Sequence, residues 1–128
     1  MALNFFKRRN LLKQLNYLEA TPIRKCAFET AENGLITLVI PKFKNEKVNN
    51  YLLSPRKRFF RIALDELGTS VWMHIDGTKK VMEICKQVYD IYGEKIMPVD
   101  QRVTRFLTML YEGKYISFKE IEKDSSSQ

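Results

Sequence analysis

Residues 65–84 read DELGTSVWMHIDGTKKVMEI, and this stretch decides the fold. It predicts a short helix, a tight turn at Asp76-Gly77 and the start of a second helix. It follows directly on an apolar and basic strand, Phe59-Phe60-Arg61-Ile62. No residue type in the stretch is arranged for catalysis. The segment therefore indicates a compact module of a strand and helices, in which the strand is available for pairing.

Three helices are predicted after the strand, which covers residues 59–64. The first begins at Asp65, a residue suited to an N-cap. The second starts near Thr78 and ends at Gly93, and the third starts at Pro98 and ends at Gly113. Apolar residues at helical spacing define the inward face of the second and third helices: Val81, Ile84, Cys85, Val88 and Tyr92, then Val99, Val103, Phe106, Leu107 and Leu110. Residues 115–118 suit a short further strand.

The segment before residue 59 predicts one helix and two strands. Residues 3–18 show a loose apolar stripe among basic residues, and Thr21-Pro22 ends this helix because a residue before proline leaves the α region. Strands follow at 23–30 and 35–40. Asn33-Gly34 between them favours a type I′ hairpin turn. Residues 42–57 form a long, basic and polar connection.

Together these elements predict an α+β fold that is winged-helix-like, with a three-stranded antiparallel sheet followed by three helices and an extra N-terminal helix. The expected organisation is an amphipathic helical extension over residues 1–20, one domain over 21–119 and a disordered tail over 120–128.

Charge and cysteine usage narrow the class of protein. The net charge of +7 is unevenly distributed: residues 1–61 hold 13 Lys and Arg against 4 Asp and Glu, a net +9, whereas residues 62–128 hold 9 against 11. A basic half favours nucleic acid, an anionic membrane or an acidic peptide as partner, and equally fits a solvated surface. Cys26 and Cys85 form no CxxC motif, and the N-terminus turns basic where a signal peptide turns apolar. A cytoplasmic protein is expected, and no run of residues is long and apolar enough for a membrane span.

The sequence contains no arrangement that favours catalysis. His74 is the only histidine, so His-dependent triads and His-rich zinc sites cannot be built within one chain. Cys85 falls on the apolar face of its helix and Cys26 on a strand, where both are expected to be core residues. Asp65 and Glu66 are neighbours in a helix and do not face each other. The expectation is a protein without enzymatic activity, metal or cofactor.

Two features point to binding. The strand at 59–64 can accept an extended peptide if it lies at the sheet edge. On the third helix, Arg102, Arg105 and Met109 recur at helical spacing beside the core row, which suits either a solvated surface or one wall of a cleft for acidic and apolar side chains.

Residues 59–118 resemble the pyrroloquinoline-quinone (PQQ) synthesis protein D family, a peptide-recognition domain of pathways that make ribosomally synthesised, post-translationally modified peptides (RiPPs). The likeness lies in Leu64-Asp65-Glu66-Leu67-Gly68-Thr69-Ser70 with Trp72, and in Ile75-Asp76-Gly77-Thr78 with Val81 and Ile84. It departs from the family at Asp65, where Asn is common, in the long connection at 42–57, and in the added residues 1–20.

The resemblance implies a non-catalytic protein that binds the leader of a precursor peptide as an added strand, over the third helix. It further implies presentation of that peptide to a modifying enzyme, often a radical S-adenosylmethionine enzyme. The peptide-binding positions carried over are Phe59, Phe60, Arg61, Ile62, Arg102, Arg105, Phe106 and Met109.

Two alternatives stay open. A winged-helix nucleic-acid-binding regulator would use the basic half, although the second helix offers only Lys79, Lys80, Lys86 and Gln87 for reading bases. Residues 1–20 suit an anionic membrane surface or a self-association helix. Packing of this helix against its own domain or a second copy, as in a homodimer, is favoured.

Overall fold

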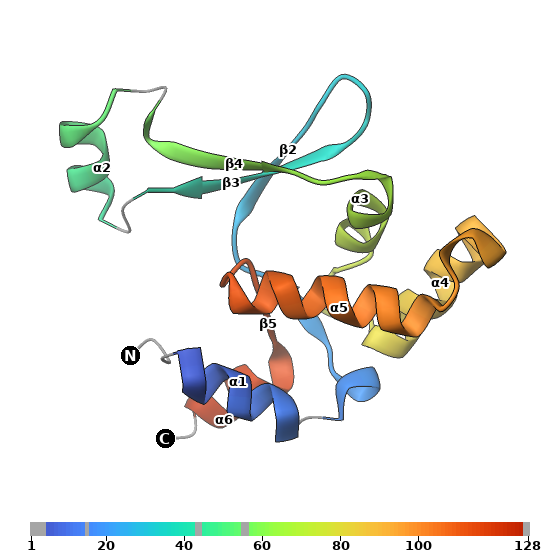
Figure 1. The fold of residues 1–128 in the computed structure, drawn as a ribbon. Coiled ribbons are helices and arrows are strands. Elements are labelled where there is room, and N and C mark those ends of the chain that lie inside the picture. Colours follow the sequence, from blue (N-terminus) through green and yellow to red (C-terminus); the bar gives the residue numbers. More distant parts are fainter. Residues whose placement is uncertain (1–4, 15, 43–44, 55–56, 127–128) are drawn as a thin grey trace. The chain divides into compact units, whose positions relative to one another are not determined.

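The computed structural model describes residues 5–14, 16–42, 45–54 and 57–126 (Figure 1). The chain divides into two compact units. The helical unit comprises Met1–Lys25 and Ser70–Gln128, and the sheet unit comprises Cys26–Thr69.

The helices are α1 (Phe5–Gln14), α2 (Glu46–Leu52), α3 (Glu66–Met73), α4 (Val81–Tyr92), α5 (Val99–Glu112) and α6 (Lys119–Ser126), with short 3-10 helices η1 (Tyr17–Glu19) and η3 (Gly93–Ile96). The strands are β1 (Pro22–Arg24), β2 (Ala27–Thr30), β3 (Ile36–Pro41), β4 (Phe59–Ala63) and β5 (Ile116–Phe118). The mixed α+β class is confirmed, as are the three-stranded antiparallel sheet followed by helices and the N-terminal helix.

The sheet unit is built on the strand order β2-β3-β4, with both neighbouring pairs antiparallel. Because side chains alternate along a strand, Ile36 and Leu38 share one face of the central strand, and both are fully buried. Ile62 of β4 lies opposite Leu38 and is half-buried on this face. The apolar run predicted for a central strand is therefore confirmed as β3.

The hairpin between β2 and β3 is confirmed, but its turn type was predicted wrongly. Ala31 N donates to Leu35 O at 2.8 Å, and Gly34 N donates to Ala31 O at 2.9 Å. Of these turn residues only Gly34 has a positive φ, of 86°. A type I′ turn needs two such residues, whereas a three-residue loop with glycine in the left-handed region needs one. Asn33 instead accepts a hydrogen bond from Leu35 N through Oδ1, at 3.0 Å.

The strand predicted over residues 23–30 is two strands in two sheets. β1 pairs antiparallel with β5, whereas β2 pairs with β3. The chain leaves the first pairing at Lys25, whose N–H still donates to Tyr115 O at 2.9 Å. The short strand expected at 115–118 is thereby confirmed as β5, and its partner is β1.

The connection at 42–57 contains the helix α2, which the sequence did not indicate. Asn45 caps its first turn by accepting hydrogen bonds through Oδ1 from Lys47 N at 2.9 Å and Val48 N at 3.3 Å. At the other end, the Arg58 guanidinium donates to Asn50 O and Leu53 O at 3.2 and 3.1 Å. These bonds hold α2 at the end of the β3–β4 hairpin (Figure 1).

The helical unit buries the apolar rows predicted from spacing. On α4, Val81, Ile84, Cys85 and Val88 are buried, and on α5, Val103, Leu107, Leu110 and Tyr111 are buried. Val99, Phe106 and Tyr92 are only half-buried. The second predicted helix begins at Val81 rather than near Thr78, because residues 76–79 form a hydrogen-bonded turn, and the third begins at Val99, one residue after Pro98.

Both ends of the described chain belong to the helical unit. α1 contacts α5, and η1 contacts α4. The predicted N-terminal stripe consists of Leu3, Phe6, Leu11, Leu15 and Leu18. The side chains of Leu3, Phe6 and Leu15 lie outside the described residues, Leu11 is half-buried and Leu18 is 37% exposed. Leu12, outside that stripe, is buried. The sequence predicts a disordered tail over 120–128, whereas the structure has α6 at Lys119–Ser126, with Ile121 buried.

Tyr17 of η1 ties the N-terminal segment to α5, and its removal should cost stability. Its hydroxyl donates to Thr104 O at 3.2 Å and shares a 2.8 Å hydrogen bond with Thr108 Oγ1. Because a buried hydrogen bond contributes about 1 kcal/mol, we expect Tyr17→Phe to lower the free energy of unfolding by about that amount at neutral pH. Urea unfolding measures this difference, and Tyr51→Phe, on a side chain that is 89% exposed, is the matched control with no expected effect.

The Tyr17 effect should also depend on pH. Burial raises the pKa of the Tyr17 hydroxyl from 10.0 to about 12, against the hydrogen bond to Thr108, which lowers it. A phenol whose pKa is raised on folding keeps its stabilising effect below its unfolded pKa and loses it as pH rises towards the folded value. The difference between wild type and Tyr17→Phe should therefore shrink between pH 10 and pH 12. A difference that grows over this range would contradict the assignment.

Candidate peptide-binding edge

β4 is an edge strand of the three-stranded sheet. In the described part of the chain, β3 is the only strand that pairs with it. The register places Arg61 opposite Val39 and Ile62 opposite Leu38. The condition that the sequence analysis set for peptide addition, a position of this strand at the sheet edge, is therefore met.

The hydrogen bonds that flank β4 show which of its backbone groups face outward. Lys42 N donates to Arg58 O at 2.9 Å, and Leu64 N donates to Ile36 O at 2.8 Å. Bonded and non-bonded pairs alternate in an antiparallel ladder, so the even-numbered residues of β4 bond to β3. The N–H and C=O groups of Phe59, Arg61 and Ala63 consequently point away from β3, towards the open edge.

The side chains of β4 give this edge two different faces. Phe60 and Ile62 lie on the face that carries the fully buried Ile36 and Leu38 of β3, yet Phe60 is 55% exposed. The Lys42 ammonium lies 5.4 Å from the centre of the Phe60 ring, a cation–π arrangement. On the other face Phe59 is 39% exposed, and Arg61 forms an ion pair with Glu29 of β2 across the sheet. The edge thus presents apolar and aromatic surface, with the Lys42 ammonium on the face of Phe60 and Ile62.

Three of the four α5 residues predicted for peptide binding lie on the outer side of that helix. Arg102, Arg105 and Met109 are exposed, with Met109 at 55%, and Phe106 is half-buried. The buried row of α5 runs through Val103 and Leu107 instead. The division of α5 into an inner and an outer face is confirmed. The eight predicted residues fall into two sets, Phe59, Phe60, Arg61 and Ile62 in the sheet unit and Arg102, Arg105, Phe106 and Met109 in the helical unit.

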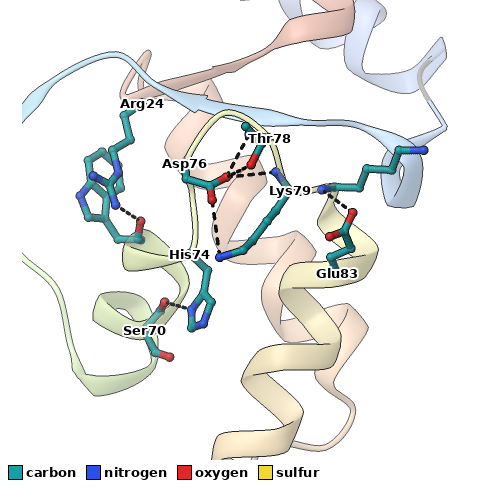
Figure 2. A network of polar contacts seen from close by, with 9 residues as sticks. Arg24, Ser70, His74, Asp76, Thr78, Lys79 and Glu83 are labelled. Atoms are coloured by element: carbon teal, nitrogen blue, oxygen red, sulfur yellow. Dashed lines mark hydrogen bonds and ion pairs between the residues drawn. The ribbon is translucent and has the colours of Figure 1, made fainter.

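Local hydrogen bonds stabilise the conformation of residues 65–84. Asp65 accepts from Gly68 N through Oδ1 at 2.7 Å, which confirms it as the N-cap of α3. Figure 2 shows the next turn, where Asp76 Oδ1 accepts from Thr78 N, Thr78 Oγ1 and Lys79 N at 2.9, 2.8 and 3.0 Å. These bonds, led by the one from the Thr78 backbone, hold the pKa of the Asp76 carboxyl well below its usual range. Asp76 is therefore a turn-forming carboxylate rather than an acid or base.

The histidine and the cysteines have structural surroundings. His74 directly follows the last residue of α3, and its Nδ1 lies 2.7 Å from the carbonyl oxygen of Ser70 in that helix (Figure 2). Cys85 is buried as predicted, whereas Cys26, predicted to be a core residue on a strand, is only half-buried and lies between β1 and β2. Burial, and next the neighbouring Asp100, raise the pKa of the Cys85 thiol to about 12, and burial also raises the pKa of Cys26. Both thiols are thus kept in their unreactive protonated form at neutral pH. Over the described residues no group of three or more His, Cys, Asp and Glu is placed to hold a metal ion.

Lys42 is the residue of this edge that sequence reasoning missed. It appeared only as part of a basic connection, because its place above Phe60 depends on the β3–β4 register, which pairs residue 42 with residue 58. The alternation of apolar and basic residues in Pro41-Lys42-Phe43-Lys44, at the end of β3, was the one available signal in the sequence, and it does not identify Phe60 as the partner of Lys42.

Comparison with known proteins identifies the family. A family model described as "Coenzyme PQQ synthesis protein D (PqqD)" matches residues 51–116, just over half of the chain. The match covers β4, α3, α4 and α5. No curated protein and no solved structure matches the chain significantly. No described helix has the length and apolar character needed to cross a membrane. The chain belongs to the coenzyme PQQ synthesis protein D family, whose domain is a RiPP recognition element.

Proposed function

We propose that this protein binds the leader of a ribosomally made precursor peptide as an additional strand on the edge of β4. It then presents the peptide to a modifying enzyme, such as a radical S-adenosylmethionine enzyme, and catalyses no reaction itself. Family membership supports a peptide-binding accessory protein in general terms. The observation that carries the finer proposal is the open edge of β4, with the backbone groups of Phe59, Arg61 and Ala63 directed outward.

Strand addition uses main-chain hydrogen bonds for affinity and alternate side chains for specificity. Three outward residues on β4 offer a peptide three N–H donors and three C=O acceptors, whereas the opposite edge strand β2 is only four residues long. Phe60 and Ile62 offer apolar contact to every second peptide side chain. We include the exposed α5 residues Arg102, Arg105 and Met109, with Phe106, as further contacts to the bound peptide.

The exposed side of α4 gives no support to the alternative of a nucleic-acid-binding regulator. A helix that reads bases normally carries several Arg, Lys, Asn or Gln side chains on its exposed side. Here the exposed residues of α4 include two carboxylates and three large apolar side chains with a single lysine: Met82, Glu83, Lys86, Tyr89, Asp90 and Ile91.

An NMR titration tests the proposed function. Peptides are first selected on the isotope-labelled protein from a random display library, and the leader of any short precursor gene beside this one is added to the set. We expect amide shifts to concentrate at residues 58–63 and 100–110. Shifts confined to α6 and β1, or to α2 alone, would contradict binding at the β4 edge. Random duplex DNA at low salt serves as the comparison and should shift neither region.

A further inference from the structure

The charges of the sheet unit are separated along the direction of β4. Residues 42–58, which precede β4, hold six Lys and Arg against the single Glu46. The other end of the sheet carries Glu32 in the β2–β3 turn and Asp65 and Glu66 directly after β4. The start of the edge strand is therefore basic and its end is acidic.

Lys42 is a described cation at this end of the strand whose position relative to an edge residue is established. Arg58 donates to the carbonyls of Asn50 and Leu53 at the end of α2, and Arg61 pairs with Glu29. Lys42 is exposed, and in the described part of the sheet unit no carboxylate forms an ion pair with it. Its ammonium lies over the ring of Phe60, an edge residue that is itself 55% exposed. A peptide side chain beside Phe60 would meet this cation.

We propose that the β4 edge selects the direction of its peptide by charge: acidic residues of the peptide lie beside Phe60 and Lys42, at the basic end of the edge. This inference rests on the proposed function, because it assigns a specificity to the same site. Both strand pairs of this sheet are antiparallel, and antiparallel pairing is slightly the more stable kind. A peptide antiparallel to β4 places its C-terminal part beside Phe59 and Phe60. The preferred ligand is therefore an extended, alternately apolar segment followed on its C-terminal side by Asp or Glu.

The same charges disfavour the reversed peptide. With the direction inverted, the acidic residues would lie at the acidic end of the edge, towards Asp65 and Glu66 at the start of α3, and like charges close together repel each other. A cross-strand charge pair contributes roughly 0.2–1 kcal/mol, so replacing attraction by repulsion at one position should change affinity by about fivefold. Such a preference is also weakened by salt, because Lys42 is exposed.

Selection from a random peptide display library tests this inference with three proteins. They are the wild type, Lys42→Glu and Lys95→Glu, the last being an exposed lysine of η3 whose reversal changes the net charge equally. Wild type and Lys95→Glu should enrich Asp and Glu on the C-terminal side of an apolar segment. Lys42→Glu should lose this enrichment and bind the wild-type-selected peptides about fivefold more weakly.

Two results would overturn the inference while leaving the proposed function intact. One is enrichment of acidic residues equally on both sides, or on the N-terminal side, of the apolar segment. The other is an equal loss of affinity in Lys42→Glu and Lys95→Glu, which would show that only net charge matters. Selected peptides that leave the amides of Phe59, Arg61 and Ala63 unshifted would overturn the proposed function and this inference with it.

Discussion

Trp72→Ala is expected to lower the free energy of unfolding by about 3–5 kcal/mol, a large part of the stability of a small domain. The Trp72 side chain is fully buried in α3. The Arg24 guanidinium stacks over its ring at 5.4 Å and donates to its carbonyl oxygen at 2.8 Å. Truncation to alanine removes the buried indole and leaves Arg24 without its aromatic partner. Chemical denaturation monitored by circular dichroism measures the loss.

Met73→Ala is the matched control for this prediction. Met73 is the next residue of α3 and is 52% exposed, so its truncation should change the free energy of unfolding by about 0.5 kcal/mol or less. Similar losses in the two variants would contradict the assignment of Trp72 as a fully buried core residue of the 65–84 stretch.

Arg61→Pro is expected to weaken peptide binding by about tenfold or more while leaving the protein folded. The Arg61 N–H points away from β3, so proline at this position removes a donor offered to the peptide without breaking a bond to β3. The residue before proline is held in the extended region, which β4 already requires of Phe60. A lost hydrogen bond and the bulk of the ring at the edge together account for a change of about 1.4 kcal/mol. Fluorescence anisotropy with a labelled selected peptide gives the affinity.

Arg61→Ala separates the backbone contribution from that of the side chain. Both substitutions abolish the ion pair with Glu29, but only proline removes the N–H. We expect Arg61→Ala to retain affinity within about threefold, because exposed ion pairs contribute little. Equal losses in the two variants would indicate that the guanidinium, and not the strand edge, binds the peptide.

Periodicity made most of the fold predictable. The rows on α4 and α5 repeat every three or four residues, and the structure buries Val81, Ile84, Val103 and Leu107 as expected. β4 was recognisable as a strand from its composition and from the Asp65 cap that follows it. These features are local, so the sequence carries them directly.

The features that were mispredicted depend on partners distant in the chain. The sequence of residues 23–30 resembles one continuous strand. It forms two strands because residues 22–24 pair with β5, which lies almost a hundred residues further along the chain. α2 depends on Arg58 to bind its last carbonyls. α6 carries Glu120, which accepts a 2.8 Å hydrogen bond from Thr21 N, and a polar tail gives no sign of such a contact.

The candidate site likewise has features that the sequence predicts and features that depend on distant pairing. The strand Phe59–Ile62 could be recognised from its apolar and basic composition, and the outer row of Arg102, Arg105 and Met109 from helical spacing. Which backbone groups of β4 face outward, and the place of Lys42 above Phe60, follow only from the β3–β4 register. A shift of that register by one residue would exchange the outward and inward groups.

Amide hydrogen exchange along β4, with and without a saturating selected peptide, tests the strand-addition proposal most directly. Strand addition predicts an alternating result: exchange at Phe59, Arg61 and Ala63 slows strongly on binding, while Phe60 and Ile62, already bonded to β3, change much less. Protection spread evenly over β4, or confined to Phe60 and Ile62, would contradict addition of the peptide as a strand at this edge.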